Sequence, residues 1–168
     1  MENRDSLKFI FYLLGIFLFP LFGFAYSDTT THPALTKEIV NFYDLFFNEK
    51  ISEEQKQLII QGSIDEDEGF RYVNHFFDPV YNEGWKGYTS AKMWAKSSLA
   101  QSPSRRTLAG AFFQFDDPND FSWERALKDF ARGDEERAFL ALGRILHLLE
   151  DASVPEHTRN DTLSLIHI

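Results

Sequence analysis

Apolar residues recur at helical spacing along most of this chain, and no short run alternates between apolar and polar residues as a half-buried strand does. The clearest apolar stripe consists of Leu35, Ile39, Phe42 and Phe46. Its spacing predicts an amphipathic helix with these side chains inward, while Thr31 and Pro33 mark the N-cap and the first turn. The pattern therefore predicts an all-α fold.

Capping residues locate further helices. The letters SEEQ at residues 52–55 form a capping box that opens a short helix, which we expect Gly62 to stop. Ser122 is placed to cap a helix that Gly133 ends, and Asp134 is placed to cap the helix that follows.

Residues 90–100 predict another helix, with Met93, Trp94 and Leu99 turned inward. Loops are predicted at residues 82–89, 101–106 and 116–120. The chain contains 18 Phe residues, so we expect aromatic side chains to pack between the helices.

The N-terminus has the pattern of an export signal. A short charged segment, residues 1–8, precedes an apolar run over residues 9–24 that is too short for an ordinary membrane span. Small residues follow at Gly23, Ala25 and Ser27. We expect residues 1–27 to be a cleaved signal peptide of an exported protein, secreted, periplasmic or held in the cell envelope; the alternative is an uncleaved membrane anchor.

Composition limits the chemistry of any site. The net charge of −9 argues against double-stranded nucleic acid as a partner, although bound cations would reverse the charge locally. The chain has no cysteine, which excludes disulfides and thiolate metal sites. Any metal must therefore be held by histidine and carboxylate.

Two side chains of the helix after Asp134 are suited to share a metal. Residues four apart on a helix differ by about 40° around its axis, so His147 and Asp151 project from one face. Gly143 lies one turn earlier and would allow a backbone or a ligand to approach closely. Pro155 is expected to end the helix, leaving His157 on a turn just beyond it. The alternative is that His147 is a hydrogen-bonded core histidine.

Other candidate ligands have equally plain alternatives. His32, near the start of the first helix, is either a surface residue or a neutral metal ligand. The acidic run at residues 63–69 is either a solvated loop or the source of a carboxylate that binds a cation together with His75.

Together these residues resemble the superfamily of zinc-dependent phospholipase C and single-strand-specific (S-one/P-one type) nucleases. Residues 142–157, LGRILHLLEDASVPEH, contain its central motif: Leu-Gly, three variable residues, His, three more, Asp, five more, and a final His with proline two positions before it. Upstream, Gly62 five residues before Asp67, and the letters HFFDP at residues 75–79, are similar to the phospholipase C pattern. His32 matches the ligand on the family's first helix. The resemblance spans about residues 32–161.

The resemblance implies a multi-helix bundle around a cluster of up to three zinc ions. Asp67, His75 and His147 would hold one zinc. Asp151 would bridge this ion to a second zinc that His32 also binds.

Further roles are implied near the end of the motif. His157 would help to hold a third zinc, and Asp67 would orient or deprotonate the attacking water. Arg159 follows His157 closely, and we include it as a candidate contact to a substrate phosphate.

The sequence also departs from the family. Members often begin the mature chain with a zinc-binding Trp, whereas no Trp precedes Trp85 here. The family completes its third zinc site with a His and a Glu four apart on a further helix, and nothing after Asp161 supplies them.

The last residues offer an explanation for this departure. Residues 163–168, LSLIHI, resemble the translation of a sequencing-library adapter, so we expect a non-native tail on a truncated domain of residues 28–162 and exclude His167 as a ligand. Resequencing the locus tests this expectation, and a genuine stop codon after Ile168 would contradict it.

The resulting expectation is an exported zinc-dependent phosphodiesterase of the phospholipase C type, acting on a phospholipid or another phosphate ester, with a membrane surface as a partner. One alternative is a single-strand nuclease or nucleotidase on the same scaffold. The other is a non-catalytic helical domain, stabilised by metal or free of it.

Overall fold

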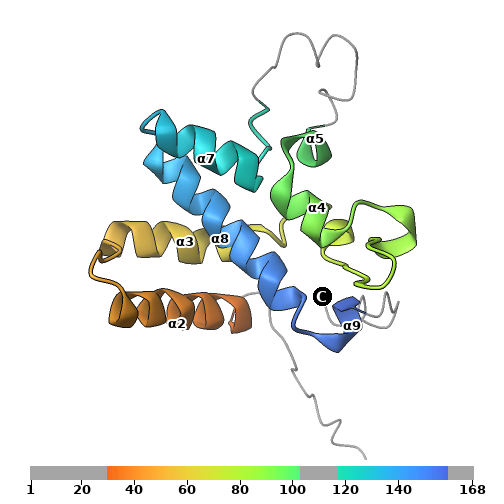
Figure 1. Ribbon diagram of the computed structural model, residues 1–168, viewed down its shortest axis with the longest axis horizontal. Coiled ribbons are helices and arrows are strands. Elements are labelled where there is room, and N and C mark those ends of the chain that lie inside the picture. Colours follow the sequence, from red (N-terminus) through yellow and green to blue (C-terminus); the bar gives the residue numbers. More distant parts are fainter. Residues whose placement is uncertain (1–29, 103–116, 159–168) are drawn as a thin grey trace, which may run out of the picture.

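The computed structural model describes residues 30–102 and 117–158, and over these residues the chain is helical without a strand, as predicted (Figure 1). The longer helices are α2 (Thr31–Phe46), α3 (Glu53–Asp65), α7 (Trp123–Ala131) and α8 (Glu135–Asp151). The shorter ones are η1 (Arg71–Asn74), η2 (Trp85–Gly87), α4 (Ala91–Lys96), α5 (Ser98–Gln101) and α9 (Pro155–Thr158). A single bridge between Asp78 and Glu83 is the extended pairing found in these residues.

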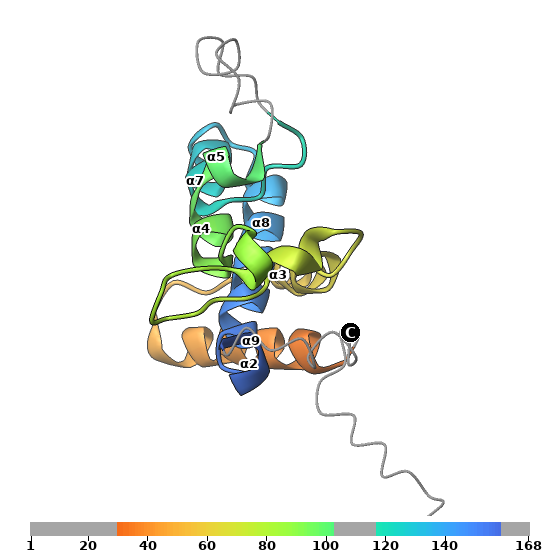
Figure 2. The same cartoon turned by 90° about the vertical axis from the view of Figure 1, so that its right-hand side faces the viewer.

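Helix α8 organises the bundle. It crosses α3, packs against α7 near its beginning and reaches α2 near its end, while α2 lies beside α3 (Figure 1). Figure 2 shows α4 alongside α8 as well. The last turns of α8 therefore meet the first turn of α2 and the end of α3, which is where the candidate ligands lie.

Two glycines allow α3 and α8 to touch. A Cβ on Gly143 would overlap the carbonyl oxygen of Ile59, and a Cβ on Gly62 would overlap that of Leu140. The prediction that Gly143 admits another backbone is thus confirmed. The prediction that Gly62 stops its helix is wrong, because α3 continues to Asp65 and uses Gly62 for close packing instead.

The first helix buries a different face from the one predicted. In α2 the inward residues are His32, Thr36 and Val40. The apolar stripe is rotated from them by roughly a quarter-turn, and Phe42 and Phe46 are 61% and 67% exposed. The polar face turns inward because its side chains have partners on α8, described below. The helix also begins one residue early, at Thr31, and its N-cap residue, Thr30, makes no side-chain capping bond.

The other predicted caps are confirmed. The capping box of α3 is complete, since Gln55 N–H donates to Ser52 Oγ and Ser52 N–H donates to Gln55 Oε1. Ser122 and Asp134 accept the equivalent hydrogen bonds at the starts of α7 and α8. Gly133 follows α7 with a φ of +84°, a conformation that favours glycine.

The helix predicted over residues 90–100 is broken at Ser97, whose backbone is extended. The next residue, Ser98, donates its N–H to Glu124 and pairs its hydroxyl with Ser122, so contacts to α7 replace a continuing helix. Met93 and Leu99 are exposed, contrary to the prediction, and Trp94 is half-buried.

Helix α8 ends at Asp151, before Pro155, and Pro155 then opens α9 instead of preceding a turn. Proline is favoured at a first helical position because its missing N–H would have no helical partner there. His157 therefore lies on a short helix, whose backbone is tied to the region after η1 by the bond from Phe77 N–H to the His157 carbonyl.

Among the described helices, none has the length and apolarity needed to cross a bilayer. The segment predicted as a signal peptide, residues 1–27, and the predicted tail, residues 163–168, both lie outside the described residues.

Candidate metal centre

The predicted ligands come together from five parts of the chain. We call the set His32, Asp67, His75, His147, Asp151 and His157 the histidine-carboxylate cluster. His32 lies in the first turn of α2, Asp67 follows α3, His75 follows η1, His157 lies on α9, and the other two residues lie at the end of α8. Of the residues proposed from the sequence, Arg159 alone lies outside the described residues.

Asp151 is the centre of the cluster. Its Oδ2 is 2.9 Å from His75 Nδ1 and 3.4 Å from His147 Nε2, and its Oδ1 is 3.4 Å from His32 Nε2. His157 is more distant, with Nε2 3.8 Å from the same Oδ1. Asp151 is 2% exposed, so four imidazoles surround a carboxylate that water hardly reaches.

Asp67 forms the second carboxylate of the cluster. Its Oδ1 is 3.5 Å from His75 Nδ1 and 3.5 Å from His147 Nε2. It is half-buried, whereas His75, His147 and Asp151 are almost fully enclosed. Asp67 is therefore the carboxylate that lies nearer to solvent.

The tautomer of His147 follows from the hydrogen-bond partner of its Nδ1. Nδ1 is 2.6 Å from the carbonyl oxygen of Ser63, and because a carbonyl only accepts hydrogen bonds, Nδ1 must carry a proton. Nε2 then faces the oxygens of Asp67 and Asp151. A neutral ring would direct a lone pair at two carboxylates, which is repulsive unless a proton or a metal ion lies between them.

His32 is held in the same way. Its Nδ1 is 2.7 Å from Glu150 Oε2, so it donates to that carboxylate, and its Nε2 faces Asp151. Metal-binding histidines commonly donate their second N–H to a carbonyl or a carboxylate, which orients the ring. Both His32 and His147 have this arrangement.

Several atoms of the cluster are buried without a hydrogen-bond partner. They are His75 Nε2, His147 Nε2, Asp151 Oδ2 and His157 Nδ1. Leaving a buried polar group unsatisfied costs about 1–3 kcal/mol. Two of these atoms, His147 Nε2 and Asp151 Oδ2, point at the position that a cation would occupy.

The proton affinities reflect the same electrostatics. Burial lowers the pKa of His147, but the nearby carboxylates of Asp151 and Asp67 outweigh it and raise the pKa to about 10. Burial would raise the pKa of Asp151, but the nearby imidazoles of His147, His32 and His75 lower it well below the usual range. The cluster therefore attracts positive charge strongly.

Two groups of side chains are close enough to hold a metal ion. They are His32, Asp67 and His147, and His75, His147 and Asp151, with one donor atom from each residue and all atoms within 4.8 Å of one another. Three nitrogen or carboxylate donors per ion are what a catalytic zinc site uses. Five of the six predicted ligands thus belong to groups able to bind a metal, although the groups pair Asp67 with His32 and not with His75 as the resemblance implied. His157 belongs to neither group.

Comparison with known proteins adds no assignment. No protein-family model, curated protein or solved structure matches this chain.

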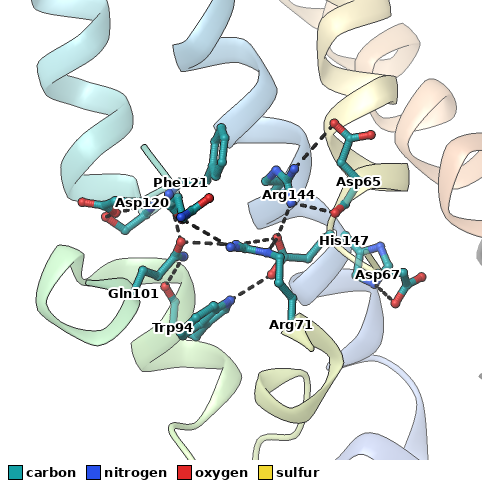
Figure 3. A network of polar contacts seen from close by, with 12 residues as sticks. Asp65, Asp67, Arg71, Trp94, Gln101, Asp120, Phe121, Arg144 and His147 are labelled. Atoms are coloured by element: carbon teal, nitrogen blue, oxygen red, sulfur yellow. Dashed lines mark hydrogen bonds and ion pairs between the residues drawn. The ribbon is translucent and has the colours of Figure 1, made fainter. Parts of the chain in front are cut away.

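A second buried polar group lies next to the cluster, shown in Figure 3. We call the set Asp65, Glu66, Arg71, Gln101 and Arg144 the arginine cluster. Glu66 is completely buried and accepts hydrogen bonds from Arg71 Nε at 2.8 Å and Trp94 Nε1 at 2.9 Å. Arg144 Nη1 donates to the Asp65 carbonyl and lies 3.4 Å from Glu66. The guanidinium groups of Arg71 and Arg144 also face the Phe121 ring.

Three hydrogen bonds that support the cluster were not predicted from the sequence. Glu150 supports His32, Thr36 supports Glu150, and the Ser63 carbonyl supports His147. The one available signal was that Thr36 follows His32 by four residues and so shares its helix face. The other two contacts join residues more than 80 positions apart and had no local signal.

Proposed function

We propose that this chain is a zinc-dependent phosphodiester hydrolase of the phospholipase C type. The observation that carries the proposal is the orientation of His147: Nδ1 is committed to the Ser63 carbonyl, and Nε2 faces Asp67 and Asp151 in a buried position. At that position a metal ion would take the place of a proton between Nε2 and the two carboxylates.

Zinc fits the donor set best. Imidazole nitrogens combined with a few carboxylate oxygens suit zinc, whereas calcium and magnesium prefer oxygen-rich sites. The cluster offers four imidazoles against two carboxylates. The chain contains no cysteine, so copper or iron sites built on thiolates do not apply.

Bound zinc would supply a Lewis acid and lower the pKa of a coordinated water toward neutrality. The side chains have separable roles around it. Asp151, enclosed among the imidazoles, holds the centre together. Asp67 lies nearer to solvent and is suited to orient the attacking water and accept its proton. His157 completes the donors on the α9 side.

The substrate class comes from the family resemblance of the motif, which implies a phospholipid, reached at a membrane surface. We also propose that residues 1–27 direct export. N-terminal sequencing of the mature protein tests this, and recovery of intact Met1 from membranes would favour the anchor instead.

One observation favours the single-strand nuclease as a second candidate. A series of stacked rings leads away from the cluster: His157 and Phe76 lie 5.1 Å apart, Phe76 and Trp85 6.0 Å, and Trp85 and Tyr88 6.0 Å. Tyr88 is 53% exposed. An exposed aromatic ring at the end of such a stack is a platform on which a base can stack.

The first experiment measures zinc in the purified full chain by elemental analysis. We expect at least one zinc per chain in the parent and a large loss in Asp151→Asn. Asp129→Asn is the matched control, because Asp129 is an equally buried aspartate paired with Arg125 and Arg137 outside the cluster. Zinc near zero in the parent, or an equal loss in both variants, would refute the metal centre.

The second experiment compares turnover of a phosphatidylcholine analogue with that of single-stranded DNA by the zinc-loaded chain. Hydrolysis of the lipid analogue that is lost in Asp67→Asn supports the proposal. Hydrolysis of DNA alone would identify the nuclease, and zinc binding without turnover of either substrate would identify a metal-stabilised domain.

A further inference from the structure

Each aspartate of the histidine-carboxylate cluster follows a buried glutamate in the chain. Glu66 precedes Asp67, and Glu150 precedes Asp151. Glu66 is 0% exposed and Glu150 is 6% exposed. A buried carboxylate is costly unless charge or hydrogen bonds compensate it, so the partners of each glutamate indicate its role.

Glu66 is compensated by cations. Arg71 and Arg144 both lie within ion-pair distance of its Oε2, at 2.7 Å and 3.4 Å, and the Trp94 indole donates to its Oε1. Toward the histidine-carboxylate cluster, its Oε1 lies 3.9 Å from His75 Nε2. Glu66 therefore belongs to the arginine cluster.

Glu150 has a different environment. Its Oε1 accepts a hydrogen bond from the Thr36 hydroxyl at 2.8 Å, and its Oε2 accepts one from His32 Nδ1 at 2.7 Å. Among the described residues, no lysine or arginine forms an ion pair with it. The His32 ring lies between the carboxylates of Glu150 and Asp151, because its other nitrogen, Nε2, is 3.4 Å from Asp151 Oδ1.

We propose that Glu150, supported by Thr36, is a positioning residue of the metal centre that fixes the ring and tautomer of His32. With Nδ1 donating to Glu150, His32 presents Nε2 as the donor atom toward Asp151. The carboxylate also makes the imidazole a stronger ligand, because it stabilises positive charge on the ring. This inference rests on the proposed metal centre and adds a residue that the motif resemblance does not assign.

The arrangement joins two helices. His32 and Thr36 lie four residues apart on the inward face of α2, and both reach the single carboxylate on α8. This contact explains why the polar face of α2 turns inward while its aromatic stripe stays exposed. A purely structural role would also predict this docking, so the test must separate ring orientation from stability.

The experiment uses the full chain with Zn²⁺ as the probe. Zinc affinity is measured by competition with a chromophoric chelator for the parent, Glu150→Gln, Thr36→Val, Thr36→Ser and the control Asp129→Asn. Glutamine keeps the shape of Glu150 without its charge, and valine keeps the shape of Thr36 without its hydroxyl. Long-range ¹H–¹⁵N spectra of the zinc-free proteins report which nitrogen of His32 carries the proton.

We expect Glu150→Gln to weaken zinc binding by about tenfold or more. Thr36→Val should weaken it less, Thr36→Ser should restore it, and Asp129→Asn should leave it unchanged. The His32 signals should shift from the Nδ1-protonated pattern in Glu150→Gln alone.

Three results would overturn the inference. If the parent binds zinc while Glu150→Gln stays within about twofold of it with unchanged His32 signals, Glu150 does not position the ligand, and the proposed metal centre stands. If Glu150→Gln and Asp129→Asn lose affinity equally, Glu150 is only structural. Absence of zinc from the parent would remove the proposed function and this inference together.

Discussion

Two buried polar clusters include residues of α8, and they differ in how many of their polar atoms have a partner within the protein. In the arginine cluster, Glu66 and the Asp65 carbonyl accept the hydrogen bonds of Arg71 and Arg144, and Arg144 Nε is the guanidinium atom of this pair left without a partner. In the histidine-carboxylate cluster, no described lysine or arginine pairs with Asp67 or Asp151, and four buried nitrogen and oxygen atoms have no partner. Both clusters bury charge, and they differ in what faces the carboxylates: permanently charged guanidinium groups in the arginine cluster, and imidazoles, which can bind either a proton or a metal ion, in the histidine-carboxylate cluster.

The largest expected effect comes from supplying the cation. Zinc that binds only the folded chain stabilises it by about 4 kcal/mol when free zinc is a thousandfold above the dissociation constant. We expect thermal unfolding to move to higher temperature on adding zinc and to return with a chelator, followed by circular dichroism. Asp151→Asn should abolish this response, while Asp129→Asn, although destabilised, should keep it. If zinc does not change the unfolding temperature of the parent protein, the histidine-carboxylate cluster is not a zinc site and differs from the arginine cluster only in composition.

Gly143→Ala should disturb both clusters at once, because both depend on the close contact of α3 with α8. The new Cβ would overlap the Ile59 carbonyl, which is backbone and cannot turn aside. We expect a loss of about 3 kcal/mol in the free energy of unfolding, measured by urea titration. Gly69→Ala is the control: its φ of +69° disfavours alanine but the space around it is open, so it should cost about 1 kcal/mol. Equal losses would argue against the helix contact.

Arg144→Met should weaken the arginine cluster alone. Glu66 would keep Arg71 and Trp94 as partners, so we expect a loss of about 2 kcal/mol, less than for a fully broken buried pair. Zinc content should not change. A variant that folds but loses its zinc would show that the arginine cluster is part of the metal centre.

The smallest effect on stability is expected at a surface ion pair outside both clusters, which serves as a reference for the larger effects. Asp44 and Lys56 lie 2.8 Å apart, and the hydrogen bond with Lys56 lowers the pKa of Asp44. A lowered carboxylate pKa stabilises the fold above the unfolded-state value, near 4, and this contribution disappears as pH falls through the folded-state pKa. Asp44→Asn should therefore make stability slightly less dependent on pH on the acid side, as seen in urea titrations at several pH values. Asp134→Asn, which keeps a helix cap, is the comparison.

Features set by neighbouring residues could be predicted from the sequence. The caps at Ser52, Ser122 and Asp134 were predicted correctly because each bond joins residues three apart. Gly133 was identified as a helix end for the same reason. By contrast, Gly62 was assigned to a helix end, since a glycine that ends a helix and one that admits another backbone look alike until the second helix is in place.

The buried face of α2 could not be predicted from its own pattern. Its apolar stripe predicts an inward aromatic face, yet partners on α8 turn His32 and Thr36 inward. Helical periodicity identifies which residues share a face and leaves open which face finds a partner. The break at Ser97 has the same origin, because the next residue, Ser98, bonds to Glu124 of α7 and to Ser122, the residue that caps α7.

The sequence by itself therefore determined the helical class, most helix starts and the residue types from which a metal site has to be built, since these depend on local hydrogen bonds and on composition. Motif spacing also placed His147 and Asp151 on one helix face. The family resemblance implied that His32, Asp67 and His75 meet this pair, and the distances between them come from the tertiary structure. The hydrogen bond between His32 and Glu150 was visible only in the tertiary structure. The physical reason is that hydrogen bonds and steric exclusion between distant segments exist only after the chain has folded.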